Sequence, residues 1–203
     1  KKLRFIHSEE LKNGKVVITD IRELVVLCPC EYSVKEINRM LGELGLSADK
    51  VALQLPIIAN AKDLKVIEKL LGELKCIKTL VSENIYGFEF ANRGYKVIAG
   101  AGHNALNRFA YTVLSQLGAS EVLPSIESGE AHYDGELPLM TFAHCPYKTL
   151  FGNDCAHCTY KEGLILSREK RKYRVVRTKV HNCYFSLFSI RGKGCFPSPP
   201  YTP

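Results

Sequence analysis

The chain has 203 residues, 46% of them hydrophobic, and a formal net charge of +7. This composition is ordinary for a soluble globular protein and predicts one sizeable core. The sequence has neither an apolar run of roughly 18 residues, as a membrane span requires, nor the apolar segment of a signal peptide, so we expect a cytoplasmic protein with no membrane partner.

Residues 1–140 alternate short β-branched runs, typical of strands, with apolar residues at helical spacing. The predicted strands span 15–20, 23–28, 51–58, 78–82, 95–100 and 121–125, and the predicted helices span 33–46, 63–74, 84–94 and 105–118. Regular alternation of this kind gives parallel strands with helical crossovers. Since a closed βα barrel needs eight such units, we predict an α/β fold in which residues 1–140 form a partial TIM-like βα barrel.

Polar residues follow five consecutive predicted strands. They are Asn60, Ser82-Glu83-Asn84, His103-Asn104, Ser125-Ile126-Glu127 and His144-Cys145. Helix capping alone explains the asparagines, because they stand where N-caps belong. It does not explain His103 or Glu127. Chemistry in βα barrels takes place at the carboxyl ends of the strands, so we predict catalytic roles for His103, Asn104 and Glu127 on one rim with Ser125 and the Cys145 loop.

After residue 140 the pattern changes to short strands. They are predicted at 138–146, 164–167, 172–180 and 184–189, with a hairpin across the basic run at 168–172. Residues 141–190 are therefore predicted to form a β-rich subdomain that is too small for a core of its own and is stapled by cysteines. Residues 191–203 are expected to be an irregular, artefactual tail.

Four of the eight cysteines have the spacing of a metal site. They are Cys145, Cys155, Cys158 and Cys183. A CxxC pair can supply two ligands from one turn, and the other two thiolates come from either side of it. Four thiolates suit either zinc or a 4Fe-4S cluster, while reduced cysteines or a redox pair are the alternative. Cys28, Cys30 and Cys76 are interpreted as packing residues.

The positive charge is concentrated near the C-terminal end. Residues 141–203 hold 11 Lys and Arg against three Asp and Glu, whereas residues 1–140 hold 17 against 18. The densest run, 168–179, is either a solvated hairpin or a phosphate-binding patch. We predict that it binds RNA, with Arg174 and Arg177 as contacts.

The segment ELPLMTFAHCPYKTLFGNDCAHCTYKEG, followed by YRVVRTKVHNCYFSLFS, resembles the C-terminal portion of the collagenase-like peptidase family, the thirty-second of unknown catalytic type. LQLPII, Asn104 with Asn107, and Ser125 with Glu127 match further motifs of that family. The resemblance implies a βα barrel with a cysteine-bound iron-sulfur or metal centre, and substrate-binding roles for Asn107 and Ser125. The family signature of Glu and His-Gly leading into Cys is absent from these 203 residues.

The resemblance implies two activities, and a third reading is non-catalytic. Family members are described as peptidases, or as needed for oxygen-independent hydroxylation of RNA bases or a quinone precursor. The chain contains neither G-x-S-x-G nor H-E-x-x-H, so direct support for peptide hydrolysis is poor. The chain alone could also be a zinc-stapled module. We expect its partners to be a missing N-terminal part of the same protein, RNA or peptide, and a second copy that covers the open barrel edges.

Overall fold

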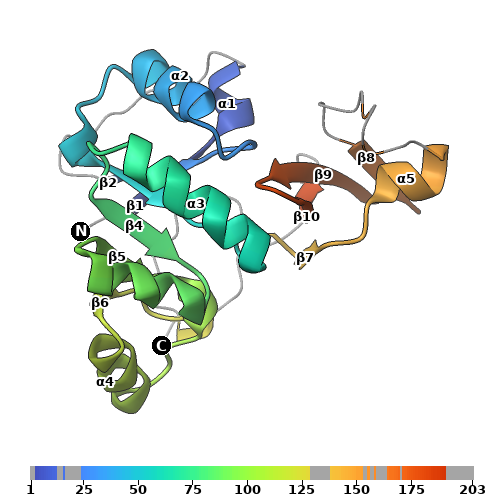
Figure 1. Ribbon diagram of the computed structural model, residues 1–203. Helices are drawn as coiled ribbons and strands as arrows, with labels where there is room; N and C mark the ends of the chain where they lie inside the picture. Colours follow the sequence, from blue (N-terminus) through green and yellow to red (C-terminus); the bar gives the residue numbers. More distant parts are fainter. Residues whose placement is uncertain are drawn as a thin grey trace. The chain divides into compact units, whose positions relative to one another are not determined.

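The computed structural model describes residues 3–12, 16, 24–128, 138–152, 155, 158, 164–169 and 171–190. The chain divides into two compact units. Unit 1 comprises Lys1–Gly135 and Thr178–Cys183, and unit 2 comprises Glu136–Arg177 and Tyr184–Pro203. A six-stranded sheet lies in unit 1, and most of a four-stranded sheet lies in unit 2 (Figure 1). The expected tail at 191–203 and most of the expected strand at 15–20 lie outside the described residues.

The strands of unit 1 are all parallel and lie in chain order. They are β1 (Leu3–His7), β2 (Leu24–Cys28), β3 (Val51–Gln54), β4 (Thr79–Ser82), β5 (Lys96–Ala99) and β6 (Ala119–Val122). The α/β class with parallel strands and helical crossovers is thus confirmed. The strand expected to reach residue 58 ends at Gln54, because Pro56 has no N–H to donate to the sheet.

Helices alternate with these strands. The α-helices are α1 (Ser8–Lys12), α2 (Val34–Leu44), α3 (Ala61–Glu73) and α4 (Arg108–Gln116), and the 3-10 helices are η1 (Ala48–Lys50), η2 (Ile85–Arg93), η3 (Ala101–His103) and η4 (Ile126–Ser128). Ser33 accepts from the Glu36 backbone N–H at the start of α2, as the capping pattern predicts. The helix expected at 84–94 is present as a 3-10 helix. No described helix is long and apolar enough to cross a bilayer.

Each face of the six-stranded sheet has its own apolar cluster. Leu27, Leu53 and Leu80 pack with Met40 of α2 and Ile67 of α3, so this face is covered by helices. In the described part of the chain, the buried members of the opposite cluster all come from the sheet: Leu3, Phe5, Leu24, Val26, Cys28, Ala52, Val81 and Ile98. We call it the strand-lined face. Right-handed crossovers between strands in chain order carry every helix to the same side, which accounts for the difference between the faces.

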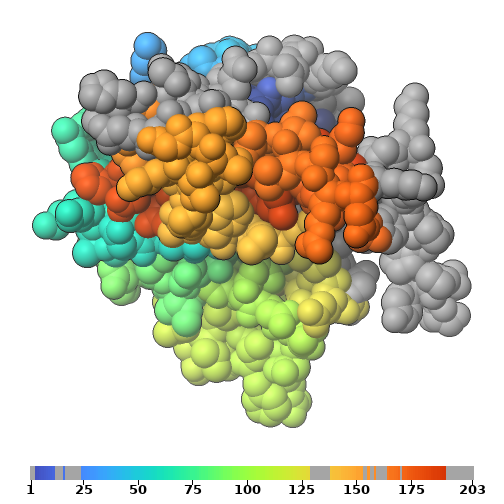
Figure 2. All heavy atoms as spheres, turned by 90° about the vertical axis from the view of Figure 1, so that its right-hand side faces the viewer, coloured from blue at the N-terminus to red at the C-terminus, as the bar shows by residue number. Residues whose placement is uncertain are grey.

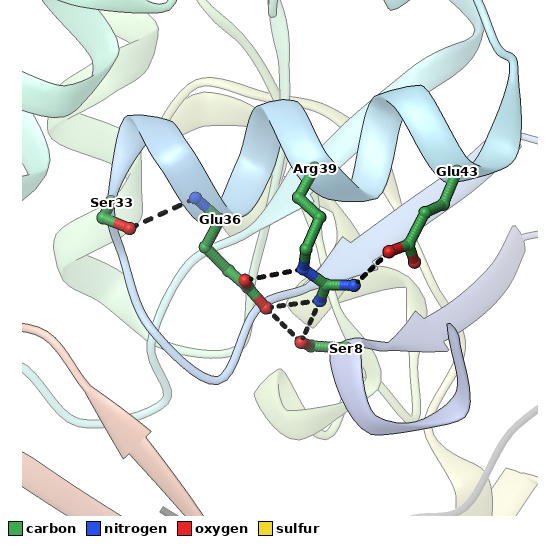
Figure 3. A network of polar contacts seen from close by, with 5 residues as sticks. All are labelled: Ser8, Ser33, Glu36, Arg39 and Glu43. Atoms are coloured by element: carbon green, nitrogen blue, oxygen red, sulfur yellow. Dashed lines mark hydrogen bonds and ion pairs between the residues drawn. The ribbon is translucent and has the colours of Figure 1, made fainter. Parts of the chain in front are cut away.

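A polar network ties α1 to α2 (Figure 3). The Arg39 guanidinium donates to both carboxylate oxygens of Glu36, at 2.9 and 2.7 Å, and to Glu43 at 2.7 Å. It also donates to the hydroxyl of Ser8, 2.9 Å away, and that hydroxyl donates to Glu36. Ser8 is completely buried. The network therefore satisfies a buried hydroxyl, and the hydrogen bonds to Glu36 raise the pKa of Arg39.

A second polar anchor in unit 1 joins segments that are 118 residues apart in the sequence. The buried Asp63 carboxylate accepts from the backbone N–H groups of His181 at 3.0 Å and Asn182 at 2.9 Å. Its other oxygen accepts from the Asn60 N–H at 3.0 Å and completes a capping box at the start of α3. One carboxylate therefore fixes both the helix start and the turn at 180–182.

Unit 2 is built on the antiparallel sheet. Its elements are β7 (Met140–Phe142), α5 (Pro146–Phe151), β8 (Leu164–Arg168), β9 (Arg171–Lys179) and β10 (Cys183–Ile190), with sheet order β7-β10-β9-β8. The ends of β9 and β10 at the 180–182 turn belong to unit 1. Tyr147 and Phe185 are each 1% exposed, with ring centroids 6.0 Å apart, and Phe142 stacks on Phe185 at 5.8 Å. The β-rich prediction and the β8–β9 hairpin are confirmed, and α5 is additional. An aromatic core packs inside this unit, and the cysteine staple stays a prediction.

Candidate functional site

The strand-lined face ends in polar side chains at the carboxyl edge of the sheet. His7 and Cys28 are register partners on β1 and β2. Gln54 ends β3 and Glu83 directly follows β4, each two positions after a residue of the strand-lined face. Because alternate strand residues share a face, four adjacent strands bring an imidazole, a thiol, an amide and a carboxylate to one edge. Ligands of parallel α/β sheets bind at this edge.

Cys28 is a hydrogen-bond donor at this edge. Its Sγ lies 2.8 Å from Oε1 of Gln54. Burial raises the pKa of the Cys28 thiol well above its ordinary value, and the carboxylates of Glu10 and Glu83 raise it further. The thiol therefore stays protonated at neutral pH and is a poor nucleophile. Cys28 closes β2 as a buried residue, which agrees with the packing role predicted for it.

Glu83 is held against a glycine turn. Its Oε2 accepts from the backbone N–H of Gly102 at 2.5 Å. A Cβ added at Gly102 would lie 2.7 Å from that oxygen, and a Cβ at Gly100 would overlap the carboxylate itself. The backbone of Gly100 is extended, so close approach of Glu83, rather than an unusual φ angle, is the reason for glycine there. This turn fixes the carboxylate in place.

The predicted rim residues fall at the carboxyl ends of β5 and β6. The buried Ser125 hydroxyl donates to Oδ1 of Asn104, and the backbone N–H of Glu127 donates to the same hydroxyl at 3.2 Å. Glu127 itself is exposed. Asn107 accepts from two backbone N–H groups and is the N-cap of α4. The structure thus brings Asn104, Ser125 and Glu127 together and gives Asn107 a capping role.

His103 lies on η3, and its ring packs against Phe88 with centroids 5.2 Å apart. Its Nε2 is buried and has no hydrogen-bond partner in the described part of the chain. Burial lowers the pKa of His103, against a smaller opposing effect of a backbone hydrogen bond at Ser82. Phe88 belongs to the helix-covered cluster, so the ring contacts that side of the sheet and not the strand-lined face.

The four predicted metal ligands are all among the described residues. Cys145 is the N-cap of α5, Cys155 is exposed, and Cys158 lies 3.6 Å from Nη1 of Arg177. These three belong to unit 2, whereas Cys183 belongs to unit 1. No group of three or more His, Cys, Asp or Glu among the described residues is arranged to hold a metal ion. The metal or cluster site therefore stays a prediction.

The basic hairpin places its cations in two environments. Arg168, Arg171 and Lys172 are exposed, and Arg168 is the direct cross-strand partner of Arg171. Arg174 is partly buried, with its guanidinium carbon 5.1 Å from the centre of the Phe188 ring. Arg177 is partly buried beside Cys158. Among the described cations of the run, those at the tip of the hairpin and Lys179 are thus more accessible than the predicted Arg174 and Arg177.

The sequence analysis missed Gln54, and it placed Glu83 among the polar residues at the strand ends without a catalytic role. Alternation along each strand would have found them, because each stands two positions after an apolar residue of the same face. Cys76, expected to be buried, is exposed, because α3 ends at Glu73 and residues 75–76 form a turn before Ile77.

No family model, curated protein or solved structure matches the chain.

Proposed function

We propose that the chain is part of an enzyme whose reaction takes place at the carboxyl edge of the parallel sheet, with Glu83 as the acid–base group. The observation that carries this proposal is the carboxylate held by the Gly100–Gly102 turn. A general acid or base must be positioned within hydrogen-bond reach of its substrate, and rigid elements do this better than mobile loops. Consecutive parallel strands with helices on one side also support a partial βα barrel.

The chemistry of the edge favours proton transfer over nucleophilic attack. A nucleophilic Ser or Cys needs an adjacent base, but Ser125 donates to an asparagine and Cys28 donates to a glutamine. Gln54 uses its oxygen for Cys28, and its Nε2 has no partner among the described residues. A substrate could therefore accept from Gln54 and donate to Glu83. The resemblance to the collagenase-like peptidase family implies two activities, peptide hydrolysis and oxygen-independent hydroxylation. This arrangement supports the hydroxylation of an RNA base or a quinone precursor better than peptide hydrolysis by a nucleophile.

The test is a screen of small polar fragments carrying amine, hydroxyl or carbonyl groups, followed by amide NMR shifts of the full chain. Bound fragments should shift Gly102 and the Gln54 side-chain amide, and Glu83→Gln should weaken their binding at least tenfold. Glu89→Gln is the matched control, because Glu89 is an exposed carboxylate on the adjacent η2. Fragments that bind elsewhere, or bind Glu83→Gln equally well, would contradict the proposal.

A second candidate function is RNA binding by the tip of the hairpin. Like charges directly opposite on neighbouring strands destabilise a sheet, as for Arg168 and Arg171, and a bound phosphate would relieve this repulsion. Three such cations in contact with single-stranded RNA should give a log–log salt slope of roughly −2. The double variant Arg171→Ala/Lys172→Ala should flatten this slope by roughly 1.4.

Fluorescence anisotropy of a labelled single-stranded RNA between low and moderate salt measures both slopes. Lys62→Ala/Lys65→Ala, which removes two exposed cations of α3 in unit 1, should leave the slope unchanged. If both double variants changed the salt slope equally, RNA binding would follow from net charge alone, and a specific role of the hairpin would be contradicted.

The zinc or 4Fe-4S site of Cys145, Cys155, Cys158 and Cys183 is part of the same proposal. The N–H···S contact from Arg177 to Cys158 supports it, because cations and hydrogen bonds at sulfur compensate the negative charge of metal-bound thiolates. Metal analysis and absorbance near 400 nm of anaerobically purified protein test it. Cys158→Ser should lose the metal, and Cys76→Ser, at an exposed cysteine of unit 1, should keep it.

A further inference from the structure

Helix α4 carries an exposed apolar stripe. Phe109 is 69% exposed, Val113 is 53% exposed and Leu117 is 45% exposed, and they follow one another at intervals of four residues. Leu114 is the buried residue of this helix, and it faces a different direction. Residues four apart form one ridge along a helix, so the three side chains make a continuous surface. Figure 2 shows this part of unit 1, in yellow-green, as a protrusion at the bottom.

Two further exposed apolar side chains come from the segment before the helix and from η4. Leu106 and Ile126 are each 49% exposed. Their neighbours Ala105 and Ser125 are joined by a backbone hydrogen bond of 3.1 Å, which keeps the two segments together. Five large side chains at this exposure amount to roughly 400–500 Å² of apolar surface. A patch of this size is typical of an interaction site rather than of scattered surface residues.

We propose that this surface is the interface with a second copy of the chain, in which two α4 helices pack antiparallel across a two-fold axis. Ridges of residues four apart pack into each other in the commonest helix–helix arrangement, and a surface with one such ridge is self-complementary. Two copies would bury roughly 800–1,000 Å² of apolar surface. The polar residues around it add further buried area, so the total reaches the lower end of the range for specific dimers.

The charges of α4 support the antiparallel arrangement. The helix has no acidic residue in its first turn and no basic residue in its last turn, and Arg108 stands at its N-terminal end. A cation there is unfavourable in a single helix, because that end of the helix dipole is positive. In an antiparallel pair, each Arg108 lies near the negative C-terminal end of the other helix. Its guanidinium carbon is 5.2 Å from the centre of the Phe109 ring, beside the apolar stripe.

Sedimentation velocity of the full chain from about 1 to 300 μM tests the proposal, because an interface of this size is expected to dissociate at about 1–100 μM. Phe109→Lys should raise the dissociation constant at least about 30-fold, as the loss of an anchoring aromatic contact does. Ser115→Lys is the matched control, since it adds the same charge on the same helix at an exposed position away from the stripe, and it should change the constant less than about threefold.

A chain that stays monomeric at the highest concentration overturns the proposal and leaves the stripe to a different partner. A dimer that Phe109→Lys does not weaken overturns it too. The orientation has its own readout in a Cys76→Ser background, which keeps the proposed metal ligands; Val113→Cys lies at the centre of the stripe and should form an interchain disulfide on oxidation. Ser115→Cys in the same background should not, and equal cross-linking of the two would refute the two-fold arrangement.

Discussion

Asp63 offers the sharpest test of how unit 1 is held together. Asp63→Ala removes the acceptor of two backbone N–H groups in the 180–182 turn and of a third at Asn60. Hydrogen bonds to a charged group are worth about 1.5–3 kcal/mol each, but they are not additive when they share one acceptor. We therefore expect the free energy of unfolding to fall by about 3–5 kcal/mol, a large part of the about 5–15 kcal/mol of a typical domain.

Two companion variants separate the contributions. Asn60→Ala removes the side-chain cap of α3 but leaves the Asp63 carboxylate on the turn, so it should cost about 1 kcal/mol. Asp63→Asn keeps the shape and one acceptor oxygen and should fall between the two. Urea unfolding followed by circular dichroism at 222 nm measures all three, and Asp63→Ala should shift the midpoint by about 1.5–2.5 M at a slope of about 2 kcal/mol/M.

Hydrogen exchange shows where the stability is lost. In Asp63→Ala the amides of His181 and Asn182 should lose protection, whereas Asn60→Ala should leave them protected. An Asp63→Ala variant that costs no more than Asn60→Ala, with both turn amides still protected, would refute the account of Asp63 as the link between α3 and the turn.

Three further predictions concern single side chains. Because burial lowers the pKa of His103, the unfolded state binds more protons than the folded state just below pH 6.5. The free energy of unfolding should therefore fall as the pH drops through that range. Urea unfolding between pH 7.5 and 5 should show this dependence, and His103→Gln should flatten it. Gly100→Ala should cost about 1–3 kcal/mol, but much less in a Glu83→Ala background, because the clash is with Glu83; equal costs in both backgrounds would contradict this. Arg39→Leu should cost about 1–3 kcal/mol in thermal unfolding and Glu43→Gln less than about 0.5, since Arg39 hydrogen-bonds the buried Ser8 whereas Glu43 forms only a surface ion pair with Arg39.

Local patterns in the sequence predict much of the fold. β-branched runs and helical spacing located β2 to β6 and the helices α2, α3, η2 and α4, because each depends on residues close in the chain. The short helices α1 and α5 were not predicted. The caps at Ser33 and Asn60 follow the same rule. Of the other asparagines predicted as caps, Asn84 makes no side-chain cap hydrogen bond and Asn104 is the C-cap of η3, whereas Asn107, predicted to bind substrate, is the N-cap of α4. The strand β1 was not predicted, since its five residues include charged and polar side chains and are too few for a clear period.

Contacts between distant segments could not be predicted in this way. Nothing around Asp63 in the sequence indicates that its carboxylate meets a turn 118 residues later. Likewise, the glycines at 100 and 102 are read as loop residues until Glu83 is seen to lie against them. The rim prediction placed its catalytic residues at the ends of β5 and β6, whereas the fixed carboxylate follows β4. Propensity describes single elements, and pairing between elements depends on packing.

The Cys28 thiol decides what kind of chemistry the carboxyl edge can support. Its burial and the nearby carboxylates keep it protonated, so it acts as a donor and orients the Gln54 amide by occupying Oε1. Among the described residues no group accepts from the amide protons of Gln54, while Glu83 presents a carboxylate fixed by the backbone. A fixed donor beside a fixed acceptor selects a ligand with the opposite pattern and allows proton transfer without a covalent intermediate. If Cys28 were a nucleophile instead, thiol reagents should modify it faster than the exposed Cys76; the raised pKa and burial predict the reverse order.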